Sequence, residues 1–258
     1  MTNFPRARGC RATLVAFGLV LLAAGSAPAA PEMTFRTTGP AVPADEPFGQ
    51  LATAAYDRVL RDKWLGVERE IEAELLVLSL CDEDRSRCTS PAALQFLTIV
   101  ADGRARGGRA RLGDVNRALN LAVRPGSDLA LYGDTDVWRS PLALLAVGAG
   151  DCEDYAIAKF VALRAAGVAA EDLRLVILHD RLHDEDHAVT AARLDGRWWL
   201  LDNRRMAMVE DIDLPNVHPL FVIDHNGVRQ YVGQLQMALG QRPAADLAAR
   251  MELAQRVK

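Results

Sequence analysis

The chain has 258 residues, of which 50% are hydrophobic and 25% are charged, and its formal net charge is −4. This composition is sufficient for one sizeable globular core and excludes a disordered chain. The acidic balance also argues against a nucleic-acid-binding protein.

The first 29 residues have the pattern of an export signal. Its three parts are the positive residues Arg6, Arg8 and Arg11, the apolar run from Ala12 to Ala24, and the small-residue cleavage site Ala27-Pro28-Ala29. The apolar run is shorter than the ~20 residues that a membrane-spanning helix needs, so we predict cleavage and a periplasmic protein. No second stretch of membrane length follows, and we expect no membrane span after cleavage. Cleavage takes the formal net charge to −7.

The segment after the signal predicts a short leader followed by helices. Residues 30–47 are rich in proline and alanine and predict a disordered leader, so that residues 48–258 form one domain. Apolar positions from Leu51 to Leu80 recur at helical spacing. Ser90-Pro91 predicts the cap and first turn of a second helix that runs to about Gly103, and a third helix is expected from about Ala110 to Val123.

Two cysteines flank a short polar loop between the first two predicted helices. Cys81 and Cys88 enclose six residues, five of them charged. In an oxidising compartment such a pair most simply forms a local disulfide. Because Cys10 leaves with the signal, Cys152 is then the unpaired cysteine of the exported chain, which calls for a functional reason.

The pattern changes from helical to strand-like in the second half of the chain. Ser140-Pro141 predicts another helix start, and residues 151–166 predict a helix that ends before Gly167. Short apolar strands follow, with hairpin turns at Asp195-Gly196 and at His225-Asn226-Gly227. The expected strands are Leu173–Leu178, Ala188–Leu194, Trp198–Leu201, Leu220–Ile223 and Val228–Val232, and a closing helix is expected over Pro243–Val257. This order predicts an α+β fold in which a central helix packs on an antiparallel sheet.

The sequence GAGDCEDYA places Cys152 among three acids, Asp151, Glu153 and Asp154. Nearby negative charge disfavours a thiolate, so these acids make the thiol less reactive unless something offsets them. A helix N-terminus at Cys152 offers one offset, because its free N–H groups and its dipole lower a thiol pKa and can hold an oxyanion.

The Asp195-Gly196 hairpin predicts a partner for this thiol. A two-residue turn pairs Leu194 with Arg197, and the same register brings His187 next to Asp202 on one face of the sheet. Cys152, His187 and Asp202 would then fill the roles of nucleophile, base and orienting carboxylate. Taken singly, each residue has an ordinary structural interpretation.

Two metal sites are conceivable in this sequence. His179, His183 and His187 are spaced by four, but they fall on a strand, a loop and the next strand, which argues against a zinc-binding helix face. The acids around Cys152 are either simple helix-start residues, with Asp151 as the cap, or ligands of a hard cation such as Ca²⁺. Asp134 and Asp136 are candidates for further ligands of that cation.

Five motifs together resemble the bacterial transglutaminase-like cysteine proteinases, whose best-understood members are LapG-type periplasmic proteases. The resemblance covers roughly residues 48–232, and its most specific part is GDCEDYA followed by a strand histidine and a strand LDN. The matching motifs are Asn116–Asn120, Asp134–Pro141, Gly148–Ala156, His187–Val189 and Leu200–Asn203.

The resemblance implies a papain-like, transglutaminase-like core in which Cys152 is the nucleophile, His187 the general base and Asp202 the orienting residue. It also implies calcium, held by Asp151, Glu153 and Asp154, with Asp134 and Asp136 as additional candidates. The known substrates of LapG-type members are large cell-surface adhesins, cut near the N-terminus at an Ala-Ala site. In those systems an inner-membrane receptor that senses cyclic-di-GMP sequesters the protease.

The chain also departs from the family pattern. Ala143 stands where many relatives carry a glutamate after Ser-Pro, and the cysteine pair and the closing helix are typical of a branch whose substrates can differ. We therefore expect an exported cysteine endopeptidase that acts through a thioester. Two alternatives stay open at this stage: acyl transfer or deamidation on glutamine, and a non-catalytic calcium-dependent binding module.

Overall fold

The computed structural model describes residues 46–232, and within them the predicted α+β order is confirmed. The predicted signal (1–29), nearly all of the leader and the predicted closing helix (243–257) lie outside the described residues. The helices are α1 (Arg58–Glu83), α2 (Pro91–Arg104), α3 (Gly108–Ala122), α4 (Asp128–Tyr132), α5 (Pro141–Val147) and α6 (Cys152–Ala165). Three 3-10 turns cover Pro47–Gly49, Ala170–Asp172 and Asp211–Asp213.

Seven antiparallel strands form the main sheet, in the order β1-β9-β8-β4-β5-β6-β7. They are β1 (Ala52–Ala54), β4 (Leu173–Asp180), β5 (Glu185–Leu194), β6 (Arg197–Leu201), β7 (Val209–Glu210), β8 (Val217–Asp224) and β9 (Gly227–Tyr231). Two short parallel strands, β2 (Arg124–Pro125) and β3 (Ala149–Gly150), form a separate ladder. Strand β3 immediately precedes α6 in the chain, and only Asp151 lies between its end and Cys152.

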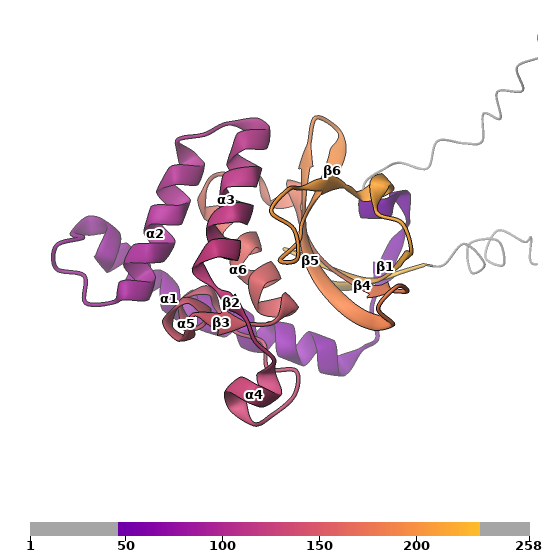
Figure 1. Ribbon diagram of the computed structural model, residues 1–258, viewed down its shortest axis with the longest axis horizontal. Helices are drawn as coiled ribbons and strands as arrows, with labels where there is room; N and C mark the ends of the chain where they lie inside the picture. Colours follow the sequence, from indigo (N-terminus) through magenta and orange to yellow (C-terminus); the bar gives the residue numbers. More distant parts are fainter. Residues whose placement is uncertain (1–45, 233–258) are drawn as a thin grey trace, which may run out of the picture. The chain divides into compact units, whose positions relative to one another are not determined.

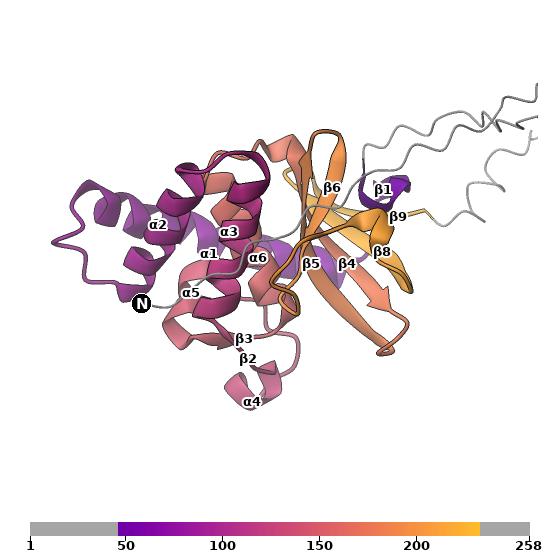
Figure 2. The same cartoon turned by 45° about the horizontal axis from the view of Figure 1, so that its top comes forward.

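Helix α6 lies between the other helices and the sheet (Figures 1 and 2). It packs on β5 and β4 on one side and on α2, α3 and α5 on the other. Its residues from Tyr155 to Phe160 are all buried, as a central helix requires. Among residues 46–232, none of the helices has the length and apolar character needed to cross a membrane.

Successive side chains of a strand point to opposite faces of a sheet. Both faces of this sheet carry buried side chains, each in its own hydrophobic cluster. Leu173, Leu175 and Ile223 face the helices and join the main hydrophobic core. Val176, Leu200 and Val222 point the other way, into a second cluster that Phe48 and Leu214 help to cover.

Helix α1 begins later than the periodicity predicts. Residues Ala52–Ala54, in the first part of the predicted helix, pair with Arg229–Tyr231 as an edge strand. The helix starts only after Asp57, whose side chain accepts a hydrogen bond from the Leu60 N–H at 2.9 Å. The prediction of helix from Leu51 was wrong because pairing with a strand distant in sequence outweighs the local pattern. The predicted disulfide between Cys81, at the end of α1, and Cys88 is present.

The start of α5 obtains its carboxylate from another helix. Glu74 on α1 accepts hydrogen bonds from the Ser140 hydroxyl at 2.6 Å and from the N–H groups of Leu142 and Ala143. A glutamate at position 143 could reach back to the cap residue in a capping box, whereas Ala143 cannot. Glu74 satisfies the free N–H groups of this helix start from outside, which explains how the chain tolerates alanine there.

Candidate active site

Cys152 is the first residue of α6, as the sequence predicts, and it is a free cysteine. Asp151 occupies the cap position, but its side chain makes no capping hydrogen bond. Glu153 and Asp154 lie in the first turn of the helix. Asp151 is therefore not an ordinary capping residue, because its carboxylate does not bond to the first N–H groups of the helix.

The Cys152 thiol is held in its protonated form. Its Sγ–H donates a hydrogen bond to Oε2 of Glu153 at 2.7 Å. Burial raises the pKa of this thiol well above its ordinary range, and the charge and hydrogen bond of Glu153 raise it further. The backbone N–H of Ala188 on β5 lowers the pKa of Cys152, but the raising effects win. In this arrangement the thiol is a poor nucleophile.

The structure brings His187 and Asp202 together. His187 is buried on β5, and its Nε2 lies 2.9 Å from Oδ1 of Asp202. Burial raises the pKa of Asp202, yet the hydrogen bond and charge of His187, helped by the Arg204 N–H, hold it below its ordinary value. Asp202 is therefore a carboxylate, and Nε2–H of His187 is the donor. Within the described part of the chain, Nδ1 of His187 has no hydrogen-bond partner.

The register predicted from the Asp195-Gly196 turn is confirmed as far as β6 extends. The pairs run from Leu194 with Arg197 to Thr190 with Leu201. Asp202 then follows in a turn, where it folds back toward His187 instead of continuing the ladder.

Cys152 and His187 line one pocket of about 310 Å³. Its walls come from the start of α1, from the segment before α5 and from β4, β5 and β8. The remaining lining residues are Asp57, Val59, Leu60, Lys63, Asp136, Trp138, Glu153, Ile177, Asp186, Ala188 and Phe221. The lining combines apolar side chains with the acidic residues Asp57, Asp136, Glu153 and Asp186.

Two asparagines of α3 hold the turn that carries Asp202. Asn116 donates from Nδ2 to the Arg205 carbonyl at 3.0 Å and to the Met206 carbonyl at 3.2 Å. Asn120 donates from Nδ2 to the carbonyl oxygens of Asp202 and Arg205, both at 3.0 Å. These residues were part of a family motif in the sequence but had no predicted role.

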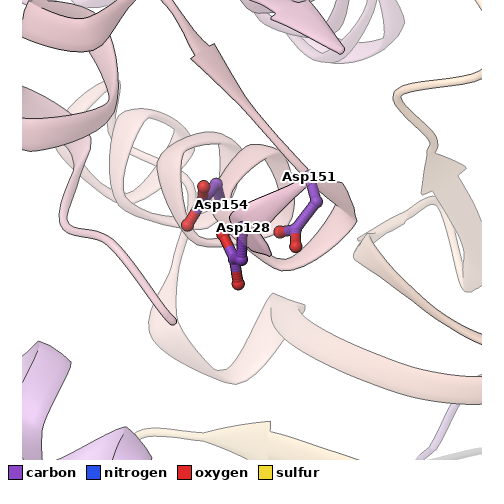
Figure 3. A group of neighbouring side chains, drawn as sticks. All are labelled: Asp128, Asp151 and Asp154. Atoms are coloured by element: carbon purple, nitrogen blue, oxygen red, sulfur yellow. The ribbon is translucent and has the colours of Figure 1, made fainter. Parts of the chain in front are cut away.

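Three aspartates from the start of α4 and the start of α6 form a group (Figure 3). Asp128, Asp151 and Asp154 each direct a carboxylate oxygen to within 4.8 Å of the others. One oxygen of each has no hydrogen-bond partner among residues 46–232. A Cβ at Gly150 would lie 2.5 Å from Oδ2 of Asp154, so only glycine leaves room for this carboxylate. Unpaired carboxylate oxygens at this spacing are suitable ligands for a hard cation.

The pKa values of this group reflect its crowding. Burial raises the pKa of Asp151 to about 9, and the charges of Glu153 and Asp154 add to the effect. Burial likewise raises the pKa of Asp154 to about 7, although the Arg139 N–H opposes it. Without a cation these carboxyl groups therefore hold protons near neutral pH, whereas an ordinary aspartate is ionised there.

The predicted metal residues are placed in different ways. Asp151 and Asp154 are in the group of three, and the carboxylate of Glu153 lies on the Cys152 thiol. Asp134 caps its own loop through the Thr135 N–H, and Asp136 forms an ion pair with Lys63. The third member of the group is Asp128, at the start of α4, which the sequence reasoning did not select.

A thiol at the start of a central helix, with a histidine in the same pocket on the adjacent sheet, defines the class of papain-like and transglutaminase-like cysteine hydrolases. The family model described as bacterial transglutaminase-like cysteine proteinase matches residues 73–213, which is more than half of the chain. The chain belongs to this family and is a cysteine peptidase.

Solved structures of Legionella pneumophila LapG have the same fold. One matches with a TM-score of 0.51 and 20% identity over 64% of this chain and 91% of that chain. A calcium-bound form matches with a TM-score of 0.51 and 21% identity over 60% of this chain and 87% of that one. An EGTA-treated form gives a TM-score of 0.50 and 20% identity, covering 60% and 83% of the two chains. No curated protein matches the chain.

Proposed function

We propose that the chain is a calcium-dependent cysteine endopeptidase in which Cys152, His187 and Asp202 act together. The observation that carries this proposal is the state of the histidine. Its Nε2 is bonded to Asp202, while its Nδ1 is unpaired and the ring lines the same pocket as Cys152. A base needs one ring nitrogen fixed by an orienting group and the other free to take the proton of the nucleophile.

The proposed reaction passes through a thioester. Nδ1 of His187 takes the thiol proton, and Sγ of Cys152 attacks the peptide carbonyl carbon. N–H groups at the start of α6 hold the oxyanion, because the first N–H groups of a helix have no partner within it. The C–N bond breaks, the leaving amine takes the proton from His187, and a water molecule then hydrolyses the thioester with His187 again as base.

The hydrogen bond between Cys152 and Glu153 must break before this reaction begins, since it holds the thiol proton on sulfur. Glu153 then has to turn its carboxylate away from Sγ. The unpaired oxygens of Asp151 and Asp154 lie beside it, on the same helix start. We infer that Glu153 changes partner from the thiol to this carboxylate group when the charge of the group is compensated.

Calcium is the cation that we propose for this role. Asp128, Asp151 and Asp154 would hold it, with Glu153 as a further ligand, and these residues fit because unpaired carboxylate oxygens at close spacing suit Ca²⁺. When bound, the ion would cancel the local negative charge that opposes thiolate formation. The Legionella pneumophila LapG structures, which have the same fold, include a calcium-bound form and an EGTA-treated form. We retain Asp134 and Asp136 as outer candidates.

We further propose that the enzyme is exported to the periplasm and acts on exported or surface proteins. The support is the signal pattern of residues 1–29 and the disulfide between Cys81 and Cys88, a bond typical of oxidising compartments. A large surface adhesin as substrate, and an inner-membrane cyclic-di-GMP receptor as a sequestering partner, remain predictions from the family resemblance.

The test compares two histidines of the same hairpin. His187→Ala and Cys152→Ala should abolish cleavage of exported and surface proteins by cells that carry the variant. The melting temperature of purified Cys152→Ala should be unchanged, so that its loss of cleavage is not a loss of fold. His183→Ala is the matched control, because its exposed ring bonds only to Asp180 at the turn of the hairpin and should leave cleavage intact. Retained proteolysis in Cys152→Ala would refute the proposal.

Two further assays separate the alternative functions. A labelled primary amine offered together with a glutamine-rich protein should not be incorporated, whereas incorporation would favour acyl transfer. Iodoacetamide should label Cys152 in the calcium-loaded protein faster than it labels a free thiol near neutral pH. Labelling no faster than that of a free thiol would favour a non-catalytic binding module.

A further inference from the structure

Lys159 is a fully buried cation that the proposed reaction does not use. It lies on α6 with 0% of its surface exposed. Its Nζ donates to the backbone carbonyl of Leu201 at 3.4 Å and lies 5.6 Å from the centre of the Tyr155 ring. A buried ammonium is costly unless it is paired, so this lysine needs a partner with negative charge.

The negative charge that acts on Lys159 is the carboxylate of Asp202. Leu201, whose carbonyl accepts the hydrogen bond from Lys159, directly precedes Asp202 in the chain. Lys159 also stands seven residues after Cys152, which is two helical turns, so both side chains lie on the same face of α6. That helix packs on β5, the strand of His187. One helix therefore presents the thiol at its start and a cation two turns further on, near the His187–Asp202 pair.

The electrostatic interaction between the two residues acts in both directions. Burial lowers the pKa of Lys159 to about 7, and the Asp202 charge opposes this shift. The charge of Lys159 is in turn one of the influences that hold the pKa of Asp202 low against its burial. The other charged groups that face Asp202 are His187 on β5 and Arg205 in its own turn, whose Nε is 3.8 Å away and whose side chain is 50% exposed.

The reaction makes a second cation necessary. When His187 is neutral, before it takes the thiol proton, it offers Asp202 a hydrogen bond but no charge. Arg205 is half in solvent, where its charge is screened. Lys159 is then the buried cation available to Asp202.

We propose that Lys159 is a positioning residue of the active site, the buried counter-ion that keeps Asp202 ionised and hydrogen-bonded to His187 while that histidine is neutral. This proposal rests on the proposed function, because it assigns a role relative to the His187–Asp202 pair. A purely structural lysine would only anchor the Leu201 carbonyl and would leave the ionisation of Asp202 unchanged.

The first test measures Asp202 itself and needs no substrate. Carboxyl ¹³C NMR follows the titration of Asp202 in the full chain and in Lys159→Met, a variant of similar length without the charge. Loss of a close buried cation should raise the pKa of Asp202 by about one unit or more. Arg205→Met is the matched control, since it removes a half-exposed cation and should shift that pKa much less. An unchanged titration of Asp202 in folded Lys159→Met overturns the proposal.

The reverse measurement keeps Lys159 and covers the case in which Lys159→Met does not fold. Side-chain ¹⁵N NMR follows Nζ of Lys159 in the natural chain and in Asp202→Asn. Since the Asp202 charge supports the ammonium, its removal should lower the pKa of Lys159 further below about 7. An Nζ titration that does not move overturns the proposal, whatever the activity of the protein.

The functional readout is the pH profile of Cys152 alkylation by iodoacetamide in the calcium-loaded protein. Lys159→Met should shift the acid limb of this profile to higher pH, and Lys159→Arg, which restores the charge, should return it toward the natural position. An identical acid limb in Lys159→Met overturns the proposal. Slow alkylation at every pH in the natural chain would count against the proposed function alone, because both NMR measurements are independent of it.

Discussion

Removal of calcium should make the stability of the protein fall as the pH rises from 5 to 7. In the folded chain the pKa of Asp151 is raised from 3.8 to about 9 and that of Asp154 from 3.8 to about 7. In the unfolded chain both groups have lost their protons by pH 5. The folded state therefore binds more protons than the unfolded state throughout this window, and stability that is present at low pH is lost as the pH rises.

The expected size of this effect follows from the Asp151 shift. A group that is protonated only in the folded state changes the free energy of unfolding by about 1.4 kcal/mol per pH unit, or about 3 kcal/mol over two units. Asp151 is partly exposed and shares its protons with its neighbours, so we take about half of this, roughly 1.5 kcal/mol. For a chain of this size that corresponds to a drop in Tm of about 3–6 °C. The lowered pKa of Lys159 makes the free energy of unfolding rise with pH, but only above about pH 7, outside this window.

Scanning calorimetry at pH 5, 6 and 7, with EGTA or with calcium, measures this dependence. Calcium should stabilise the protein more at pH 7 than at pH 5, because its ligands must first lose their protons. Asp151→Asn is the control, since it removes the raised carboxyl and should flatten the dependence on pH in EGTA. A Tm in EGTA that is constant or rises from pH 5 to 7 would refute the reasoning, as would equal stabilisation by calcium at both pH values.

Four further predictions concern single contacts. Asp128→Asn should weaken calcium binding roughly tenfold, about 1.4 kcal/mol, by calorimetric titration, because one of the three charges is lost. Asn116→Ala should cost about 2 kcal/mol in denaturant unfolding and lower the alkylation rate of Cys152, since the amide holds the turn that carries Asp202. Glu74→Ala should cost about 2 kcal/mol by the same unfolding assay, because it leaves N–H groups at the start of α5 without partners. Reduction or double Ser substitution of Cys81 and Cys88 should lower the free energy of unfolding by about 2–3 kcal/mol.

The hairpin around Asp195-Gly196 shows how much local sequence can predict. Its two-residue turn determined the pairing of Leu194 with Arg197, and the ladder keeps that register up to Thr190 and Leu201. His187 and Asp202 lie just beyond this end of the ladder, 2.9 Å apart. Both the turn preference and the alternation of side chains are local properties of the chain. The structure differs from the prediction in one respect. Strand pairing was expected to continue past Asp202, but it stops at Leu201, and Asp202 reaches His187 from a turn.

Residues that act across distant segments could not be predicted in this way. Asp128 joins Asp151 and Asp154 only because α4 folds against β3, a contact without a periodic signal in the sequence. Lys159 in an alanine-rich helix has the pattern of a solvent-facing charge, and only the packing of α6 between two layers buries it. The Asp57 cap of α1 was likewise hidden, because the preceding residues also fit a helix until β1 pairs with β9.

Charged residues of α6 act on both groups of the proposed proton transfer, the Cys152 thiol that gives the proton and the His187–Asp202 pair that receives it. Glu153 opposes the transfer, whereas Lys159 favours it. Glu153 stabilises the protonated thiol, so the nucleophile stays inactive while this carboxylate remains in place. Lys159 and His187 both lower the pKa of Asp202, so under the two proposals His187, the proposed base, is oriented before any substrate arrives. The base is thus prepared in advance and the nucleophile is not. Under the proposed function, a cation at the aspartate group controls activity by acting on the thiol alone. Calcium should therefore change the reactivity of Cys152 while leaving the Asp202 titration unchanged.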